Sequence, residues 1–240
     1  MYSFHGKVRY SECDEHGNIT IPALINYLQD CSTFHTESLG HGVSFLAEHH
    51  FAWFIMAWQI SIERLPRYCE HITVSTWCYG LSATSAKRNF TIVGEDGSTL
   101  VSADSLWVTV DTNTGLPIRV PKGEDVYLTD DEPLHMPRTQ RKLKLTGEGK
   151  RHDPIVVTEQ HLDSNHHVNN AQYITMADRI IRVLDPNFNL GTILVQYRHP
   201  AQLGDTLYPV LYDEGTSYAV DLCDEDGSRY CAVRMLAPRD

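Results

Sequence analysis

The sequence has no run of eighteen apolar residues, so it lacks the continuous hydrophobic stretch that a membrane-spanning helix requires. Its start, MYSFHGKVRYSE, has neither the apolar core of a signal peptide nor the Arg- and Ser-rich composition of a transit peptide, and we expect a cytoplasmic protein. Cysteine is sparse, and its six residues form no CxxC pair. They are expected to be reduced and mostly buried rather than part of a disulfide framework.

Positive charge is also scarce, with 20 basic residues against 31 acidic ones and a net charge of −11. This balance argues against general binding of nucleic acids or of anionic membranes, because both need a positive field. One stretch differs: residues 138–151 carry six basic side chains and only one acidic one, Glu148. A solvated linker surface and a docking patch for an acidic partner both fit this composition.

Motifs for metals and phosphates are missing. Thirteen histidines are present, but they form no HxxxH pattern and no histidine–carboxylate array at ligand spacing. The glycine pairs, such as those in GEDG and GHG, do not form a phosphate-binding loop and are expected to be turns. We therefore predict neither a metal site nor a bound cofactor.

What the 240 residues do contain is a duplication, on an ordinary globular composition with 42% hydrophobic residues. Residues 8–30 align with 157–179, so that Asp14 lies opposite Asp163 and Asn18 opposite His167. Residues 58–74 parallel residues 194–210, with Pro66 matched to Pro200. Later, TS and EDGS recur in the same order in both halves, at 84–85 and 95–98, and at 216–217 and 225–228.

Each half has the pattern of a short strand that leads into one long amphipathic helix, followed by several further strands. The helices are predicted at 22–39 and 169–184 because apolar residues recur on one helical face. The strands alternate and are separated by turn signals such as EDG, as in antiparallel hairpins. They are predicted at 51–65, 71–80, 85–94 and 99–111, and at 193–200, 206–214, 217–225 and 229–236. This is an α+β plan, in which two such units side by side would form one continuous sheet with two central helices.

The segment DSNHHVNN, residues 163–170, immediately precedes the second helix and concentrates polar chemistry. His167 suits proton transfer, and Asp163 and Asn165 could orient its ring. Asn169 and Asn170 lie at the helix start, where N–H groups favour an oxyanion. Taken alone, the segment is equally typical of an Asx-rich turn that enters a helix.

The run LDSNHHVNNAQYI, residues 162–174, resembles the D-x-N-x-H-V-N-N-x-x-Y-I signature of acyl–acyl-carrier-protein thioesterases. The first half also resembles that family, in ERLPRYCEHITVSTW and SADSLWVTVDTNTGLPIRVP, so the likeness covers nearly the whole chain. It implies two tandem hot-dog domains, each an antiparallel sheet wrapped around one long helix. We expect an N-terminal hot-dog domain at 1–125, which would hold the acyl chain, a linker at 126–152, and a C-terminal domain at 153–240.

The resemblance implies that Asp163, Asn165 and His167 are catalytic. Hydrolysis of a thioester needs a polarised carbonyl, a stabilised oxyanion and an activated water or nucleophile. Asn169 and Asn170 are expected to bind substrate because their place at the helix start suits the oxyanion. The resemblance also implies hydrolysis of fatty acyl–acyl-carrier-protein to free fatty acid and carrier, which ends fatty acid synthesis, with acyl carrier protein as partner through its phosphopantetheine-linked chain. Trp53 and Trp58 belong to an aromatic run that is typical of a core and also suits an acyl channel. The second-half helix carries Arg179 and Arg182, which fit a solvated face or contact with the carrier.

One departure separates this chain from the family. Where members carry a glutamate credited with activating water, and plant members often a cysteine beside it, Pro200 and Ala201 stand here. Gln202 can position a water molecule but cannot deprotonate it. One alternative is an acyl-CoA thioesterase, which keeps the same chemistry. Another is a non-catalytic hot-dog protein that binds acyl thioesters, which Pro200 favours. Two fused hot-dog domains are compatible with a monomer or a homodimer, and the sequence does not reveal the preferred chain length.

Overall fold

The computed structural model describes residues 1–238, and the chain divides into two compact units at Met1–Thr139 and Gln140–Asp240. The division falls inside the segment 126–152 for which a linker is predicted. No helix within the described residues has the length and apolar character of a membrane span.

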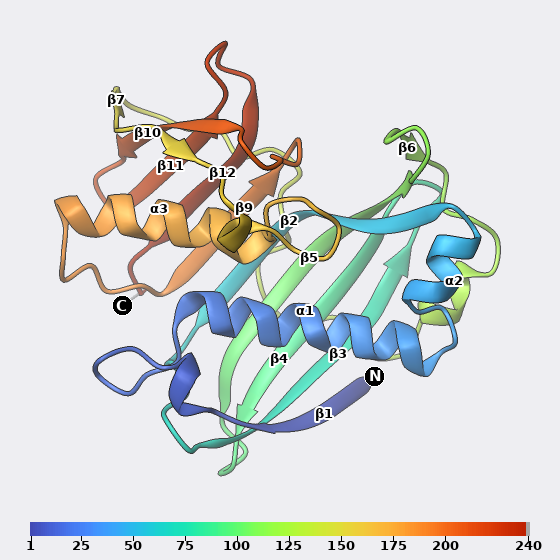
Figure 1. The fold of residues 1–240 in the computed structure, drawn as a ribbon. Helices are drawn as coiled ribbons and strands as arrows, with labels where there is room; N and C mark the ends of the chain where they lie inside the picture. The colour runs from blue at the N-terminus through green and yellow to red at the C-terminus, as the bar shows by residue number, and fades with distance from the viewer. Residues whose placement is uncertain (239–240) are drawn as a thin grey trace. The chain divides into compact units, whose positions relative to one another are not determined.

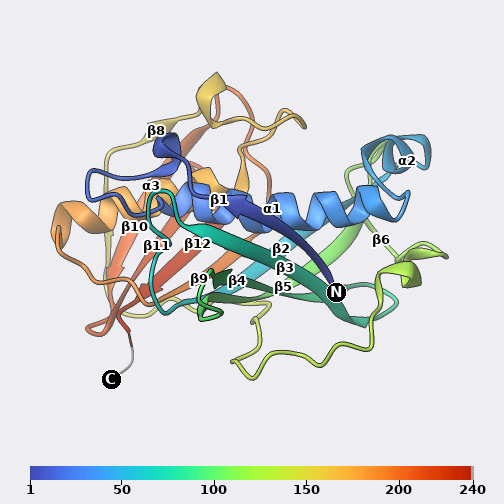
Figure 2. The ribbon, with the colours of Figure 1, turned by 90° about the horizontal axis from the view of Figure 1, so that it is seen from below.

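The first unit is an antiparallel sheet with one long helix (Figure 1). Its strands lie in the order β1-β3-β4-β5-β2, and the short β6 pairs with β5. The helix α1 runs along one face of this sheet in both ribbon views (Figure 1 and Figure 2) and contacts β3 and β1. The elements are β1 Tyr2–Lys7, α1 Ile21–Ser38, α2 Val43–Glu48, β2 Phe51–Ile62, β3 His71–Leu81, β4 Ala86–Gly94, β5 Thr99–Asp111 and β6 Pro117–Ile118.

The second unit repeats this plan. Its strands lie in the antiparallel order β9-β12-β11-β10-β7, β8 also pairs with β10, and the helix α3 packs against β11, β12 and β10. The elements are β7 Gly149–Arg151, β8 Ile155–Val156, α3 Asn170–Leu184, β9 Thr192–Tyr197, β10 Thr206–Asp213, β11 Ser217–Cys223 and β12 Arg229–Leu236. The predicted α+β fold of two tandem hot-dog domains is confirmed.

Both long helices begin at a residue that caps them, and burial of their apolar faces stabilises them. The Thr20 hydroxyl accepts a hydrogen bond from the Ala23 N–H at 3.4 Å, and Pro22 occupies the first turn, where it loses no helical hydrogen bond. Leu24, Ile25 and Leu28 are fully buried on the sheet-facing side of α1. Each such side chain contributes about 1.5–3 kcal/mol by leaving water, so Leu28→Ala is expected to cost about 2–5 kcal/mol.

The segment around the division between the units is held by polar side chains of each sheet. In the first unit, the Leu134 N–H donates to Asn89 at 2.9 Å and the Thr139 N–H donates to Asp104 at 2.7 Å. In the second unit, Gln196 accepts from the Leu143 N–H at 3.0 Å and donates to the Arg141 carbonyl at 2.6 Å. The buried amides and carboxylate of the sheets therefore pair with backbone groups of this segment.

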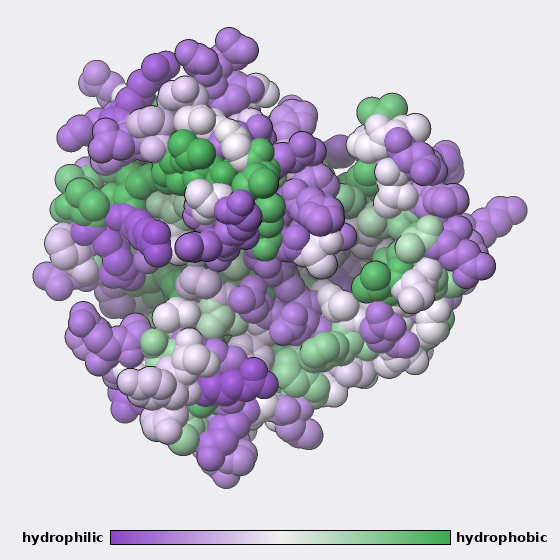
Figure 3. Space-filling view, in the orientation of Figure 1, coloured by the Kyte–Doolittle hydropathy of each residue, from purple (hydrophilic) through white to green (hydrophobic). Residues whose placement is uncertain are grey.

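The surface seen in Figure 3 is mostly hydrophilic, with separate hydrophobic patches. Among the large apolar side chains that remain exposed are Val183 and Leu184 at the end of α3. Scattered exposure of this kind is normal in a folded protein and marks no site by itself.

Candidate active site

The loop that precedes α3 is a tight turn closed by its own backbone. Leu162 and Val168 form an antiparallel bridge, and the Asp163 N–H donates to the His167 carbonyl at 2.8 Å. The His166 N–H donates back to the Asp163 carbonyl at 3.1 Å. His166 has a φ of +60°, a left-handed conformation that non-glycine residues seldom adopt. The turn therefore fixes the backbone on both sides of His167.

Asp163 shapes this turn through its carboxylate. One oxygen, Oδ1, accepts the Asn165 N–H at 2.8 Å and, at the longer distance of 3.4 Å, the His167 N–H. Within residues 1–238 no hydrogen bond joins the Asp163 carboxylate to the His167 ring. Asp163 thus acts on the two other predicted catalytic residues through their backbone.

A second turn, between β9 and β10, supports the loop from the opposite side. The Val168 N–H donates to the Ala201 carbonyl at 2.9 Å, and His167 forms an isolated antiparallel bridge with Gln202. The Ala201 N–H donates in turn to the Tyr173 hydroxyl of α3 at 2.8 Å. Burial raises the pKa of Tyr173, so the group that accepts this bond is the neutral hydroxyl. Tyr173 is the tyrosine of the family-like signature, and the sequence alone gives no sign of this contact.

Asn165 and His167 share one surface hollow of about 370 Å³. Gln202 and His166 also line it, and Leu162 and Leu203 provide its apolar wall. The His167 side chain is half-buried, whereas Asn165 and Gln202 are exposed. The hollow therefore brings together an imidazole and two carboxamides, a set that can accept a proton and donate hydrogen bonds to a carbonyl.

The helix start offers fewer donors than the sequence suggests. The Asn169 side chain accepts the Ala171 N–H at 2.8 Å, and the Asn169 carbonyl accepts the Gln172 N–H at 2.9 Å. The Asn170 carbonyl accepts the Tyr197 hydroxyl at 3.0 Å. Asn169 is thus a helix cap, and the N–H groups of Ala171 and Gln172 are already bonded.

Pro200 and Ala201, which replace the expected glutamate and cysteine, do not line the hollow. Pro200 is exposed, and Ala201 is fully buried behind the loop. Among the residues of the hollow, only His166 and His167 are titratable. A carboxylate base is therefore missing from the described site.

The two predicted substrate-binding tryptophans lie in the first unit. Trp53 is partly buried, and its indole N–H donates to the Glu124 carboxylate at 2.7 Å. Glu124 is itself buried and also contacts His41 at 2.8 Å. Trp58 is fully buried, with its ring 4.9 Å from that of Phe90. Trp58 is thus a core residue, whereas Trp53 is partly buried and packs against a small buried cluster.

The first unit contains the same loop backbone as the second. The Asp14 N–H donates to the Asn18 carbonyl at 2.8 Å, and Asp14 Oδ1 accepts the His16 and Asn18 N–H groups at 2.9 Å each. Gly17 has a φ of +76° where the second unit has His166. The duplication is therefore present in the structure at the level of individual hydrogen bonds.

The second marker of the duplication aligns one residue away from its predicted register. The Ile19 N–H donates to the Pro66 carbonyl at 2.8 Å, which corresponds to the bond from Val168 to Ala201. Pro66 is therefore the counterpart of Ala201 rather than of Pro200. Sequence comparison favoured the identical prolines, but backbone pairing determines the register.

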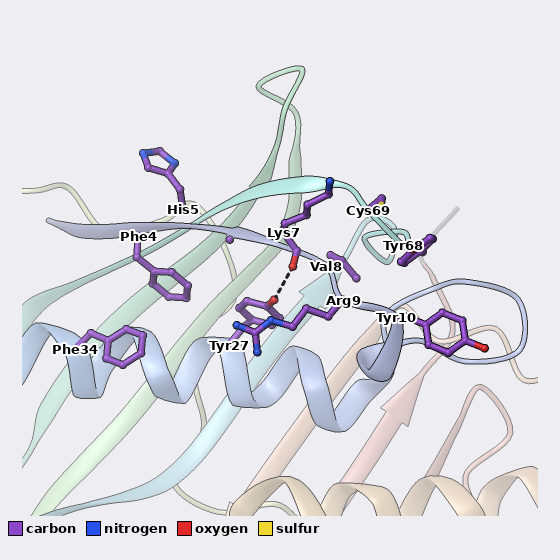
Figure 4. A pocket seen from close by; sticks show the side chains of 11 residues that line it. Phe4, His5, Lys7, Val8, Arg9, Tyr10, Tyr27, Phe34, Tyr68 and Cys69 are labelled. Carbon is purple, nitrogen blue, oxygen red and sulfur yellow. Dashed lines mark hydrogen bonds between the residues drawn. The ribbon is translucent and has the colours of Figure 1, made fainter.

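The first unit also has a larger hollow of about 580 Å³ between β1 and α1 (Figure 4). Phe4 and Phe34 lie at one end and Tyr10 and Tyr68 at the other, while the Tyr27 hydroxyl donates to the Lys7 carbonyl at 3.3 Å. None of the predicted catalytic or substrate-binding residues lines it. Across the described residues, no group of three or more His, Cys, Asp or Glu side chains is arranged to hold a metal ion.

Comparison with known proteins agrees with this architecture. The chain is 25% identical over 236 residues to the chloroplastic oleoyl-acyl carrier protein thioesterase of Coriandrum sativum, covering 89% of this chain and 62% of the relative. It is 23% identical over 240 residues to the dodecanoyl-[acyl-carrier-protein] hydrolase of Cinnamomum camphora, covering 91% and 61%. The chain thus spans about three fifths of the length of these relatives.

The fold matches a crystal structure of an acyl-ACP thioesterase from Bacteroides thetaiotaomicron with a TM-score of 0.88 and 22% identity, covering 98% of this chain and 96% of the other. The family models for the acyl-ACP thioesterase N-terminal and C-terminal domains match residues 1–127 and 146–236. The chain therefore belongs to the acyl-ACP thioesterase family.

Proposed function

We propose that this protein hydrolyses fatty acyl–acyl-carrier-protein thioesters to free fatty acid and carrier, the step that ends fatty acid synthesis. The observation that carries the proposal is the shared hollow of Asn165 and His167, in the part of the chain that matches the family's C-terminal domain. The curated relatives are named for this class of hydrolysis, with oleoyl and dodecanoyl chains.

In the proposed reaction, His167 is the general base for water. The water oxygen forms a bond to the thioester carbonyl carbon as its proton passes to the imidazole, and the carbon–sulfur bond then breaks. The imidazolium returns the proton to the departing thiolate, so the products are a carboxylic acid and a thiol. A positioned imidazole contributes about 10²–10⁴-fold to such a step.

Asn165 is proposed to donate its carboxamide N–H to the thioester carbonyl oxygen, where negative charge develops. Asp163 is a positioning residue, because its carboxylate holds the backbone N–H groups of Asn165 and His167. Asn169 supports the site as the cap of α3. This arrangement needs no carboxylate base at residue 200, since proton transfer is assigned to the imidazole alone.

The acyl chain is assigned to the first unit, where Trp53, Leu81 and Trp107 pack around the buried Cys78 and Ala86. These partly buried apolar residues suit an alkyl chain, which gains about 0.8 kcal/mol for each buried CH₂ group. The fully buried Trp58 would support the wall of such a pocket rather than contact the chain.

Acyl carrier protein is proposed as the partner that delivers the chain. Arg141, Lys142 and Lys144 have exposed side chains, and the backbone at Arg141 is fixed by its bond from Gln196. They offer local positive charge on a protein of net charge −11. Arg182 is a weaker candidate for docking, because it pairs with Asp178 at 3.0 Å. The cytoplasmic location and the assembly as monomer or homodimer stay predictions.

Thiol release tests the proposal most simply. Wild type and His167→Ala would be compared on an acyl-carrier-protein and on acyl-CoA of the same chain length. We expect a higher kcat/KM for the carrier-bound chain and a loss of about 10²–10⁴-fold in kcat for His167→Ala. Equal rates for wild type and variant would contradict the proposal, and a preference for acyl-CoA would reassign the substrate.

A further inference from the structure

Gln202 lies directly across the site from His167. The two residues form an antiparallel bridge, and both line the hollow of about 370 Å³. In such a bridge the facing side chains lie on the same side, with Cβ atoms about 4.5–5.5 Å apart. The Gln202 carboxamide is therefore within reach of the imidazole, either directly or through one water molecule.

The fold makes no use of the Gln202 side chain. The backbone N–H of Gln202 donates to the Asp205 carboxylate at 2.8 Å and so shapes the turn. The side chain itself is exposed and makes no hydrogen bond within residues 1–238. A carboxamide offers both a donor and an acceptor, and here both face the hollow unengaged.

The first unit has the same bridge with different side chains. Asn18 pairs with Arg67, whose backbone N–H donates to the Glu70 carboxylate at 2.8 Å. The pairing itself therefore requires neither a histidine nor a glutamine. Arginine can only donate hydrogen bonds, whereas glutamine can also accept one. The second unit thus has, at this bridge, a group that can accept a hydrogen of a water molecule.

We propose that Gln202 holds the hydrolytic water against His167, an inference that rests on the proposed thioesterase function. Gln202 Oε1 accepts one hydrogen of the water, and a ring nitrogen of His167 accepts the other. The oxygen lone pair is then free to attack the thioester carbonyl carbon. Gln202 neither gains nor loses a proton in this step, because the proton passes to His167 and then to the departing thiolate.

The test uses the full-length protein with acyl-carrier-protein thioester and three variants. Gln202→Met keeps the length of the side chain and removes its polar atoms, and Gln202→Ala removes the side chain. Both are expected to lower kcat at least tenfold with KM within twofold. Gln202→Glu retains an accepting oxygen and is expected to keep more than a third of the plateau kcat. Its pH–rate profile should move to higher pH on the acid side, because a carboxylate favours the protonated imidazole.

Arg67→Met is the matched control, since it places the same residue at the equivalent bridge of the first unit, and it should leave kcat within twofold. Thermal unfolding midpoints verify that every variant is folded. A Gln202→Met enzyme with kcat within twofold of wild type overturns the inference, as does a Gln202→Glu enzyme as slow as Gln202→Met. Failure of the proposed function would look different: wild type would release no thiol, or His167→Ala would be as fast as wild type.

Discussion

Two loops with one backbone carry different chemistry in this protein. In each unit an aspartate, Asp14 or Asp163, closes the turn with the same carboxylate oxygen, and a residue in the left-handed conformation follows. The first loop has Asn18 facing Arg67, whereas the second has His167 facing Gln202. Since the shared bonds account for the fold of both loops, the differing side chains are where function is expected.

The units also differ at the far ends of their helices. His35 near the end of α1 is buried, and its Nδ1 accepts a hydrogen bond from the buried Arg88 at 2.9 Å. The duplication places His35 opposite Leu184, which is exposed at the end of α3. The first unit therefore has a buried His35–Arg88 pair near the end of its helix, where the second unit has an exposed leucine.

The largest expected effect is a loss of folding stability in acid, which should come from the His35–Arg88 pair. Burial, together with the charge of Arg88, lowers the pKa of His35 from 6.5 to about 4. Between about pH 6.5 and about pH 4, His35 is therefore protonated in the unfolded chain but neutral in the folded protein. The free energy of unfolding falls as the pH falls through this range. The loss is about 3 kcal/mol by pH 4, at 1.36 kcal/mol for each unit of pKa.

Denaturant unfolding of wild type and His35→Gln between pH 7.5 and pH 4 measures this loss. Glutamine can accept the Arg88 hydrogen bond but does not titrate, so the variant should have a flatter dependence on pH. Identical pH dependence in the two proteins would contradict the assignment to His35.

Substitution of the turn aspartates should show whether Asp163 acts by holding the backbone of the turn or through the charge of its carboxylate. Asp163→Ala removes the acceptor of the Asn165 and His167 N–H groups and is expected to lower kcat about tenfold, equivalent to about 1.4 kcal/mol. Asp163→Asn keeps an accepting oxygen and should retain kcat within threefold, because asparagine forms the same turn. Asp14→Ala is the control and should affect stability but not kcat.

The carboxylate charge itself would be essential if Asp163→Asn were as slow as Asp163→Ala. Asp163 would then act directly on the imidazole or the substrate, and the positioning role assigned from its backbone bonds would be wrong.

The smallest effect is expected at the left-handed residues. Gly17→Ala places a Cβ at a φ of +76°, although no atom lies within 4 Å of it. The conformation alone should lower the free energy of unfolding by about 1 kcal/mol. His166→Gly should change it by less than that, because relief of strain is offset by the greater freedom of the unfolded chain. Chemical denaturation of both variants measures the difference, and equal large losses would show that His166 has contacts not accounted for by its backbone.

Much of this fold was predictable because its signals are local. The helices predicted at 22–39 and 169–184 appear as Ile21–Ser38 and Asn170–Leu184, and the strands at 99–111 and 229–236 have the predicted bounds. The strand predicted at 193–200 ends at Tyr197. The residues after it belong to the turn that supports the site, so tertiary pairing overrides the strand pattern there.

Other features depend on contacts far apart in the sequence. A strand ahead of the first helix was predicted without bounds, and its place at YSFHGK, as β1, depends on its pairing with β3. The convergence of Asn165, His167 and Gln202 on one hollow also requires the two turns of the second unit to meet. The motif indicated the first two residues, whereas the proximity of Gln202 is a property of the fold.

The central claim is that the second loop performs chemistry on a backbone that the first loop uses for structure alone. The most direct test is kcat for thiol release from acyl-carrier-protein thioester, measured for wild type, His167→Ala and the matched variant Asn18→Ala. The account predicts a loss of about 10²–10⁴-fold for His167→Ala and less than a twofold change for Asn18→Ala. Equal effects of the two substitutions on kcat would contradict it.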